Sequence, residues 1–168
     1  MRSFSLAALA VLMAAPAAAQ QPTAVGVVRP LYELVRTNIQ RSAEMVPEAD
    51  YSFRPTEAVR TFGQLFGHVV NARYMLCSMV KGEENPVGQN FEEVTAKADL
   101  VAALTASAVY CDGAYAISDA RGMEPLTVFR RETSRLGALV MNATHDWEHY
   151  GNLVTYMRIR GMVPPSSM

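Results

Sequence analysis

The sequence contains three histidines, and two of them are spaced so that both could bind one metal ion. His145 and His149 are four residues apart, which on a helix places two side chains one turn apart on the same face. His68 lies in a separate amphipathic stretch. Asp146 stands where the zinc-protease motif H-E-x-x-H requires glutamate, so that motif is absent. The residues alone therefore indicate a candidate ligand set, and surface histidines on an amphipathic helix remain the alternative.

A site of three neutral imidazoles would leave coordination positions open for water or substrate, as in catalytic zinc sites. A divalent ion in such a site could lower the pKa of bound water to about 7 or activate a thiolate. Zinc, nickel and iron all accept imidazole ligands, so the residue types do not choose among these metals. Ligation by histidines alone predicts that metal binding weakens below about pH 6.5, where free imidazoles are protonated.

Several polar residues near the histidines are candidates for hydrogen bonds that orient the imidazole rings. Each of them could equally be a solvated residue on a helix surface. They are Asn71, Asn142 and Asn152, with Asp146 and Glu148 as acidic alternatives.

Four segments have apolar residues at the spacings of three and four that are typical of helices, and none has a convincing strand pattern. The predicted helices cover approximately residues 23–45, 61–81, 96–118 and 130–160. In the first, Leu31 and Leu34 are among the residues expected to face the core. The second is predicted to begin with a capping box of Thr61 and Gln64 and to end at Gly82.

Four long helices predict an all-α protein folded as a four-helix bundle. The polar connection between the second and third helices contains Pro86 and Gly88 and is long enough to cross the end of a bundle. The second and third helices can therefore run parallel, in an up-down-down-up order.

Residues 1–20 have the pattern of a secretory signal peptide, and residues 21–168 are expected to form one domain. Arg2 precedes an apolar run from Leu6 to Ala15, and small residues follow Pro16. The alternative is an uncleaved membrane anchor, but a membrane span needs about 20 apolar residues. We therefore expect an exported protein, located in a bacterial periplasm, that has no membrane association after cleavage.

The charged residues argue against nucleic-acid binding and against binding to a membrane surface. The chain has 15 basic and 16 acidic residues, scattered along its length. Proteins that bind phosphate backbones or anionic lipid concentrate positive charge on one surface. A small-molecule substrate is compatible with this charge pattern.

Cys77 and Cys111 are the two cysteines, and an even pair in an exported protein suggests a disulfide. If the second and third helices are parallel, both thiols lie at nearly the same height in the bundle. The alternative is a pair of small buried side chains without a bond.

Three segments resemble the DinB family, and the family pattern to which they belong covers nearly all of residues 21–168. One is the closing stretch from His145 to Ser166, which reads HDWEHYGNLVTYMRIRGMVPPS; the others are YSFRPT from Tyr51 and TFGQLFGH from Thr61. The resemblance implies a DinB-like up-down-down-up four-helix bundle. It also implies that His68, His145 and His149 hold a divalent transition metal, and that the protein forms a homodimer.

Some members of the wider superfamily are metal-dependent thiol transferases or isomerases that use bacillithiol or mycothiol. The resemblance thus favours a metal-dependent enzyme, resembling a thiol transferase or acting as a hydrolase. Export counts against the thiol cofactors, which are chiefly cytosolic. The alternative is a non-enzymatic metal-binding or stress-associated module, which a fully ligated ion without an adjacent cavity would support.

Overall fold

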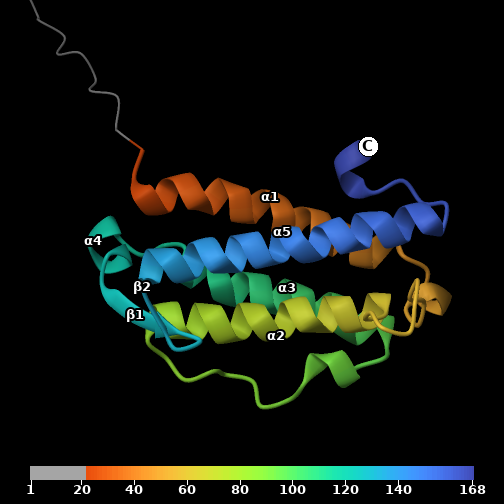
Figure 1. Ribbon diagram of the computed structural model, residues 1–168, viewed down its shortest axis with the longest axis horizontal. Helices are drawn as coiled ribbons and strands as arrows, with labels where there is room; N and C mark the ends of the chain where they lie inside the picture. The colour runs from red at the N-terminus through yellow and green to blue at the C-terminus, as the bar shows by residue number, and fades with distance from the viewer. Residues whose placement is uncertain (1–21) are drawn as a thin grey trace, which may run out of the picture.

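The computed structural model describes residues 22–168, and the predicted signal peptide lies outside this range. Four long helices pack against one another as a four-helix bundle, which confirms the predicted fold class (Figure 1). None of the helices in the described range is long and apolar enough to cross a membrane. The long helices are α1 (Ala24–Met45), α2 (Phe62–Lys81), α3 (Lys97–Ala114) and α5 (Arg135–Ile159). The shorter ones are η1 (Glu48–Asp50), η2 (Phe91–Glu93), α4 (Asp119–Gly122) and η3 (Pro165–Ser167).

The helices follow the expected up-down-down-up order. In Figure 1, α2 and α3 run in one direction, while α1 and α5 run in the opposite direction. The segment between α2 and α3 returns along the bundle and contains η2, which packs against α2. Helix α5 contacts both α1 and α2, so residues far apart in the sequence meet between α2 and α5.

Helix α2 begins and ends where the sequence predicts. The Thr61 hydroxyl accepts a hydrogen bond from the Gln64 backbone N–H at 3.1 Å, and the Gln64 side chain accepts one from the Thr61 N–H at 3.0 Å. This reciprocal capping box satisfies two amide groups that the first helical turn leaves free. At the other end, Gly82 has a φ of 75°, the left-handed conformation that ends many helices.

A β-hairpin separates α4 from α5, so the prediction of a fourth helix from residue 130 and of no strands is wrong in this region. Strands β1 (Pro125–Val128) and β2 (Arg131–Ser134) pair antiparallel, with Val128 opposite Arg131. Helix α5 begins only at Arg135, where the Ser134 hydroxyl caps it. Helix α3 also ends earlier than predicted, at Ala114.

The two residues at the tip of this hairpin explain why the sequence did not reveal it. Phe129 and Arg130 have positive φ values of 49° and 64°. A two-residue turn with positive φ at both positions is the type I′ geometry, which is normally signalled by asparagine and glycine. Neither residue is present, so the segment lacks the usual sequence signal for a hairpin.

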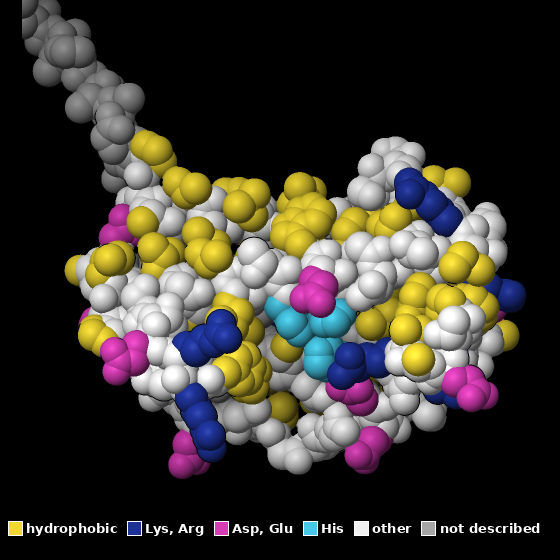
Figure 2. Space-filling model, in the orientation of Figure 1, with side chains coloured by type: hydrophobic (Ala, Val, Ile, Leu, Met, Phe, Trp, Pro, Cys, Tyr) yellow, Lys and Arg dark blue, Asp and Glu magenta, His cyan; other side chains and the backbone are white. Residues whose placement is uncertain are grey.

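The buried face of α1 differs from the predicted one at Leu31 and Leu34, whereas other residues of the predicted face, such as Val35 and Ile39, are buried. Leu31 and Leu34 were expected to face the core but are 53% and 54% exposed, whereas Tyr32 is completely buried. The ring of Tyr32 stacks on Tyr115, the residue that follows α3, with the ring centroids 4.2 Å apart. Because Tyr32 occupies the core, the two leucines lie on the outer surface of α1, where Figure 2 shows a row of hydrophobic side chains.

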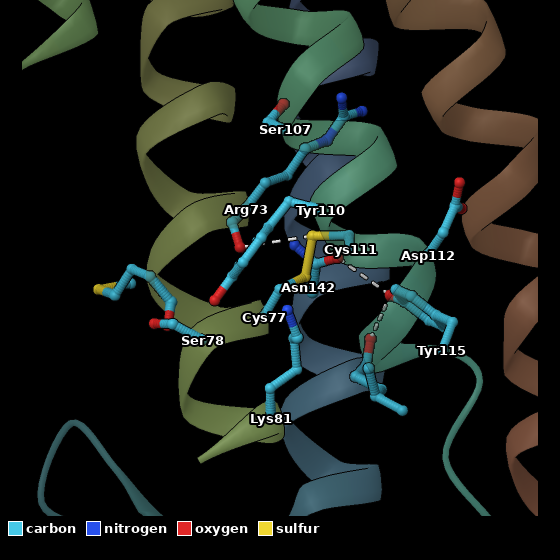
Figure 3. Close-up of a disulfide and its surroundings, with 12 residues drawn as sticks. Arg73, Cys77, Ser78, Lys81, Ser107, Tyr110, Cys111, Asp112, Tyr115 and Asn142 are labelled. Carbon is cyan, nitrogen blue, oxygen red and sulfur yellow. Dashed lines mark hydrogen bonds between the residues drawn. A yellow bond between two sulfur atoms is a disulfide. The ribbon is translucent and has the colours of Figure 1, made fainter. Parts of the chain in front are cut away.

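The structure contains the predicted disulfide, which joins α2 to α3. Cys77 and Cys111 have Cα atoms 5.3 Å apart, and both side chains are completely buried. Figure 3 shows the bond between the two parallel helices, with Tyr115 and Asn142 nearby. The parallel order of α2 and α3 brings the two thiols to the same height and so permits the bond.

Candidate metal centre

The three histidines come together between α2 and α5. His68 projects from α2, and His145 and His149 project from one face of α5. The Nε2 atom of His145 lies 3.2 Å from that of His68 and 3.1 Å from that of His149. Figure 2 shows the three side chains side by side in a hollow on the surface.

The spacing of these nitrogens fits a single metal ion. One ligand atom from each histidine lies within 4.8 Å of the others. In a tetrahedral zinc site, with zinc–nitrogen bonds of about 2.0–2.1 Å, the ligand nitrogens are about 3.3 Å apart. The two separations of 3.1 and 3.2 Å from His145 Nε2 to the other Nε2 atoms are thus close to those in a tetrahedral zinc site.

The protonation of two of the histidines suits metal binding. Burial lowers the pKa of His145 to about 4, and the neighbouring His68 adds to the effect. Burial likewise lowers the pKa of His149 to about 4, assisted by His145 and His68. Both imidazoles are therefore neutral at neutral pH, which is the form that binds a metal.

Glu92 orients His68, and the sequence did not single this residue out. Its carboxylate accepts a hydrogen bond from His68 Nδ1 at 2.7 Å, while its other oxygen accepts one from Arg60 Nε at 2.9 Å. Partial burial raises the pKa of Glu92, but the hydrogen bonds from Arg60 and His68 outweigh it and hold that pKa below its usual value. A proton held on Nδ1 leaves the Nε2 lone pair of His68 free for a metal.

Two of the three predicted asparagines form their hydrogen bonds with groups other than the imidazole rings. Asn71 accepts a hydrogen bond from the backbone N–H of Phe91 at 3.0 Å and donates one to Asn90 at 2.7 Å. It therefore fixes η2, the element that carries Glu92. Asn142 accepts a hydrogen bond from the hydroxyl of Tyr115 at 3.0 Å, within the core.

The remaining candidates lie on α5. The side-chain nitrogen of Asn152 is 3.5 Å from Nδ1 of His149, a long contact. Glu148 is exposed beside His149 and lines the polar cavity described below. Asp146 is completely buried and contacts Arg73 rather than a histidine.

The ion pair of Arg73 and Asp146 joins α2 to α5 next to the histidines. Arg73 Nε donates to Asp146 Oδ2 at 2.8 Å, and the two side chains are 1% and 0% exposed. Burial raises the pKa of the Asp146 carboxyl, and the Arg73 guanidinium opposes that rise. Because Asp146 follows His145 directly, this pair fixes the part of α5 that must face His68.

Gly67 allows η2 to approach α2 closely. A Cβ atom at Gly67 would lie 2.2 Å from the backbone oxygen of Phe91, so alanine does not fit without moving that backbone. We expect Gly67→Ala to lower the free energy of unfolding by more than about 1 kcal/mol, since backbone must shift. It should also weaken zinc binding several-fold, because Glu92 moves away from His68. Urea denaturation and zinc titration measure the two effects.

Gly151→Ala is the matched control, because a Cβ atom at Gly151, also within a helix, meets nothing within 4 Å. This variant should equal the parent or gain about 0.5–1 kcal/mol from the better helix propensity of alanine. If Gly67→Ala behaved like Gly151→Ala in both measurements, the close approach of η2 would have no role in orienting His68.

Two cavities lie on opposite sides of the histidine cluster. The first has a volume of about 370 Å³ and is lined by His68, His145 and mainly apolar residues. The second, of about 490 Å³, includes His149 with polar residues such as Arg60, Glu148 and Asn152. A metal held by the three histidines would therefore adjoin space for a small molecule.

The sequence of this chain matches the family model of the DinB superfamily over residues 31–153. The protein belongs to the DinB superfamily. The match includes all three histidines and covers most of the described bundle. A comparison with curated proteins finds no match.

Solved structures show the same DinB fold. A DinB-like protein from Bacillus cereus has a TM-score of 0.74 and 16% identity, with 87% of this chain and 98% of that chain covered. A DinB-like protein from Bacillus subtilis has a TM-score of 0.65 and 16% identity, covering 82% and 93%. A mycothiol-dependent maleylpyruvate isomerase has a TM-score of 0.63 and 20% identity, and the match covers 77% of this chain and 60% of that one.

Proposed function

We propose that this protein binds a divalent transition metal through His68, His145 and His149 and acts as a metal-dependent enzyme on a small molecule. The observation that supports this best is the convergence of three Nε2 atoms, with neighbouring distances of 3.1 and 3.2 Å, between two cavities. A purely structural metal would be fully ligated and would have no adjacent cavity. The two cavities therefore favour an enzyme over a non-enzymatic binding module.

The residues around the site have distinct roles in this proposal. The three imidazoles carry no charge when neutral, so a bound divalent ion would act as a Lewis acid that lowers the pKa of a coordinated water or thiol. Glu92 keeps the proton of His68 on Nδ1. Arg60 holds the Glu92 carboxylate in place. The reaction we propose is a thiol transfer or a hydrolysis, and the fold is one that a mycothiol-dependent isomerase also uses.

Metal analysis of purified protein tests the proposal. We expect about one zinc, nickel or iron ion per chain in the parent, because three histidine ligands form one site. The double variant His145→Ala, His149→Ala should contain none. Thr155→Ala is the control, since Thr155 is exposed on the same helix and its hydroxyl bonds only to the backbone oxygen of Gly151. Absence of metal from the parent after incubation with all three ions would overturn the proposal.

The protein should keep its metal at a lower pH than would a site built from imidazoles with the ordinary pKa. Protons compete with the metal for the ligand nitrogens, and the pKa values of His145 and His149 are lowered from 6.5 to about 4. Zinc affinity measured from pH 7.5 downwards should therefore fall most steeply as the pH approaches 4. The metal-free protein should also lose stability between these two pKa values, since its unfolded form binds more protons there. Full occupancy of the folded protein at pH 3.5 would contradict ligation by histidines alone.

A further inference from the structure

We propose that the substrate is a small molecule with an anionic donor group and an uncharged aromatic group, and that its ring occupies the apolar cavity beside His68 and His145. This inference rests on the proposed function and specifies its substrate class. The donor group would bind the metal, and the ring would contact Phe129, Met75 and Met141.

The size and lining of the cavity suit one ring. Its volume of about 370 Å³ lies at the lower end of the range for ligand pockets. Its apolar side chains are Ala72, Met75, Leu76, Phe129 and Met141. The thioethers of methionine adapt in shape and make favourable contacts with aromatic rings. These side chains therefore favour an aromatic group over a polar one.

The charges around the cavity favour an uncharged group inside it and an anionic group at the metal. Glu92 is the charged side chain among the residues that line the cavity, and Arg60 and His68 already engage its two oxygens. A charged group deep in this cavity would therefore be buried without a partner, which is costly. At the metal, three neutral imidazoles leave the charge of the ion uncompensated, so an anionic donor is favoured there.

Phe129 occupies a strained position at the mouth of the cavity. It has a φ of 49° in the hairpin turn, and its side chain lines the cavity although the residue is 65% exposed. Asparagine or glycine would adopt this conformation more easily. Backbone strain of this kind is concentrated at functional sites, where it is retained for a purpose. An exposed ring that lines the same cavity as His68 and His145 is such a purpose.

The cavity on the other side of the cluster differs in character and supplies a control. It contains Arg60, Glu148, Asn152 and Tyr156 beside His149, so it suits water or a polar co-reactant. Val59 lines this polar cavity and is 40% exposed. The variant Val59→Asn therefore makes the polar cavity more polar and leaves the apolar cavity unchanged.

Binding of phenylacetate and acetate to the zinc-loaded protein tests the inference. The two probes share a carboxylate and differ in the ring. We expect phenylacetate to bind about tenfold more tightly or better, from burial of the ring. With ¹³C-labelled methionine methyl groups, assigned through Met75→Leu and Met141→Leu, phenylacetate should shift the signals of these two residues and acetate should not.

The variant Phe129→Asn should remove most of the preference for phenylacetate while thermal unfolding shows equal or higher stability. Val59→Asn should leave the preference unchanged. Zinc content is measured on the same samples, which separates the two hypotheses. With zinc bound, any of three results would overturn this inference and leave the proposed function standing. These are equal binding of phenylacetate and acetate, unchanged Met75 and Met141 signals, and a full preference for phenylacetate in Phe129→Asn. If no zinc is bound, the proposed function itself is overturned.

Discussion

Replacing Asp146 with alanine should lower the free energy of unfolding by about 3–5 kcal/mol, because it leaves the charge of Arg73 buried without a partner. Both side chains are almost completely inaccessible to solvent, and they are joined by a hydrogen bond of 2.8 Å. Urea denaturation of the metal-free protein, with the disulfide intact, measures the change. A loss below about 1 kcal/mol would contradict it, since that is the range of exposed ion pairs.

A double variant distinguishes the destabilisation caused by an unpaired buried charge from the contribution of the ion pair to the free energy of unfolding. Arg73→Met combined with Asp146→Leu removes both charges and keeps much of the volume, so it should be far more stable than Asp146→Ala. The exposed pair of Arg29 and Glu33 is the control. Glu33→Ala should cost less than about 1 kcal/mol. A double variant as unstable as the single one would show that packing, and not charge, causes the loss.

The same ion pair should also affect the metal site. It joins α2 to α5 beside His145, so its loss allows the two helices to shift and separates His68 from His145. Leu153→Ala provides a comparison, because Leu153 is completely buried on α5 and its truncation should cost a similar amount, about 2–5 kcal/mol. Zinc affinity should fall more in Asp146→Ala than in Leu153→Ala.

Removing the disulfide should lower the free energy of unfolding by about 4 kcal/mol in the chain-entropy model. The bond closes a loop between residues 34 positions apart. Its loss therefore raises the conformational entropy of the unfolded chain. The suitable variant is Cys77→Ala with Cys111→Ala, because both positions are completely buried and serine would place a hydroxyl in the core.

Chemical reduction of the parent is the second way to break this bond. Denaturation of the parent with and without a reductant should show the same difference as the double variant, whereas the double variant itself should not respond to the reductant. A difference below about 1 kcal/mol in both experiments would show that packing between α2 and α3 makes the bond energetically unimportant.

The sequence by itself determined the features that depend on local spacing. The capping box of Thr61 and Gln64 and the left-handed Gly82 involve only near neighbours in the chain, so residue types reveal them. The helical repeat placed His145 and His149 on one face for the same reason. The parallel order of α2 and α3, inferred from the length of their connection, then explained how Cys77 could meet Cys111.

Only the tertiary structure decided the contacts between segments that are distant in the chain. Glu92 lies 24 residues beyond His68, in a connection whose path follows from the close packing at Gly67. Asp146 looked like a polar residue of a helix surface, but its partner Arg73 is 73 residues away, and the pair is buried where two helices meet. Tyr32 takes the core position expected for Leu31 because its ring stacks on that of Tyr115, at the end of α3. In each case the deciding energy comes from a partner that local sequence patterns do not contain.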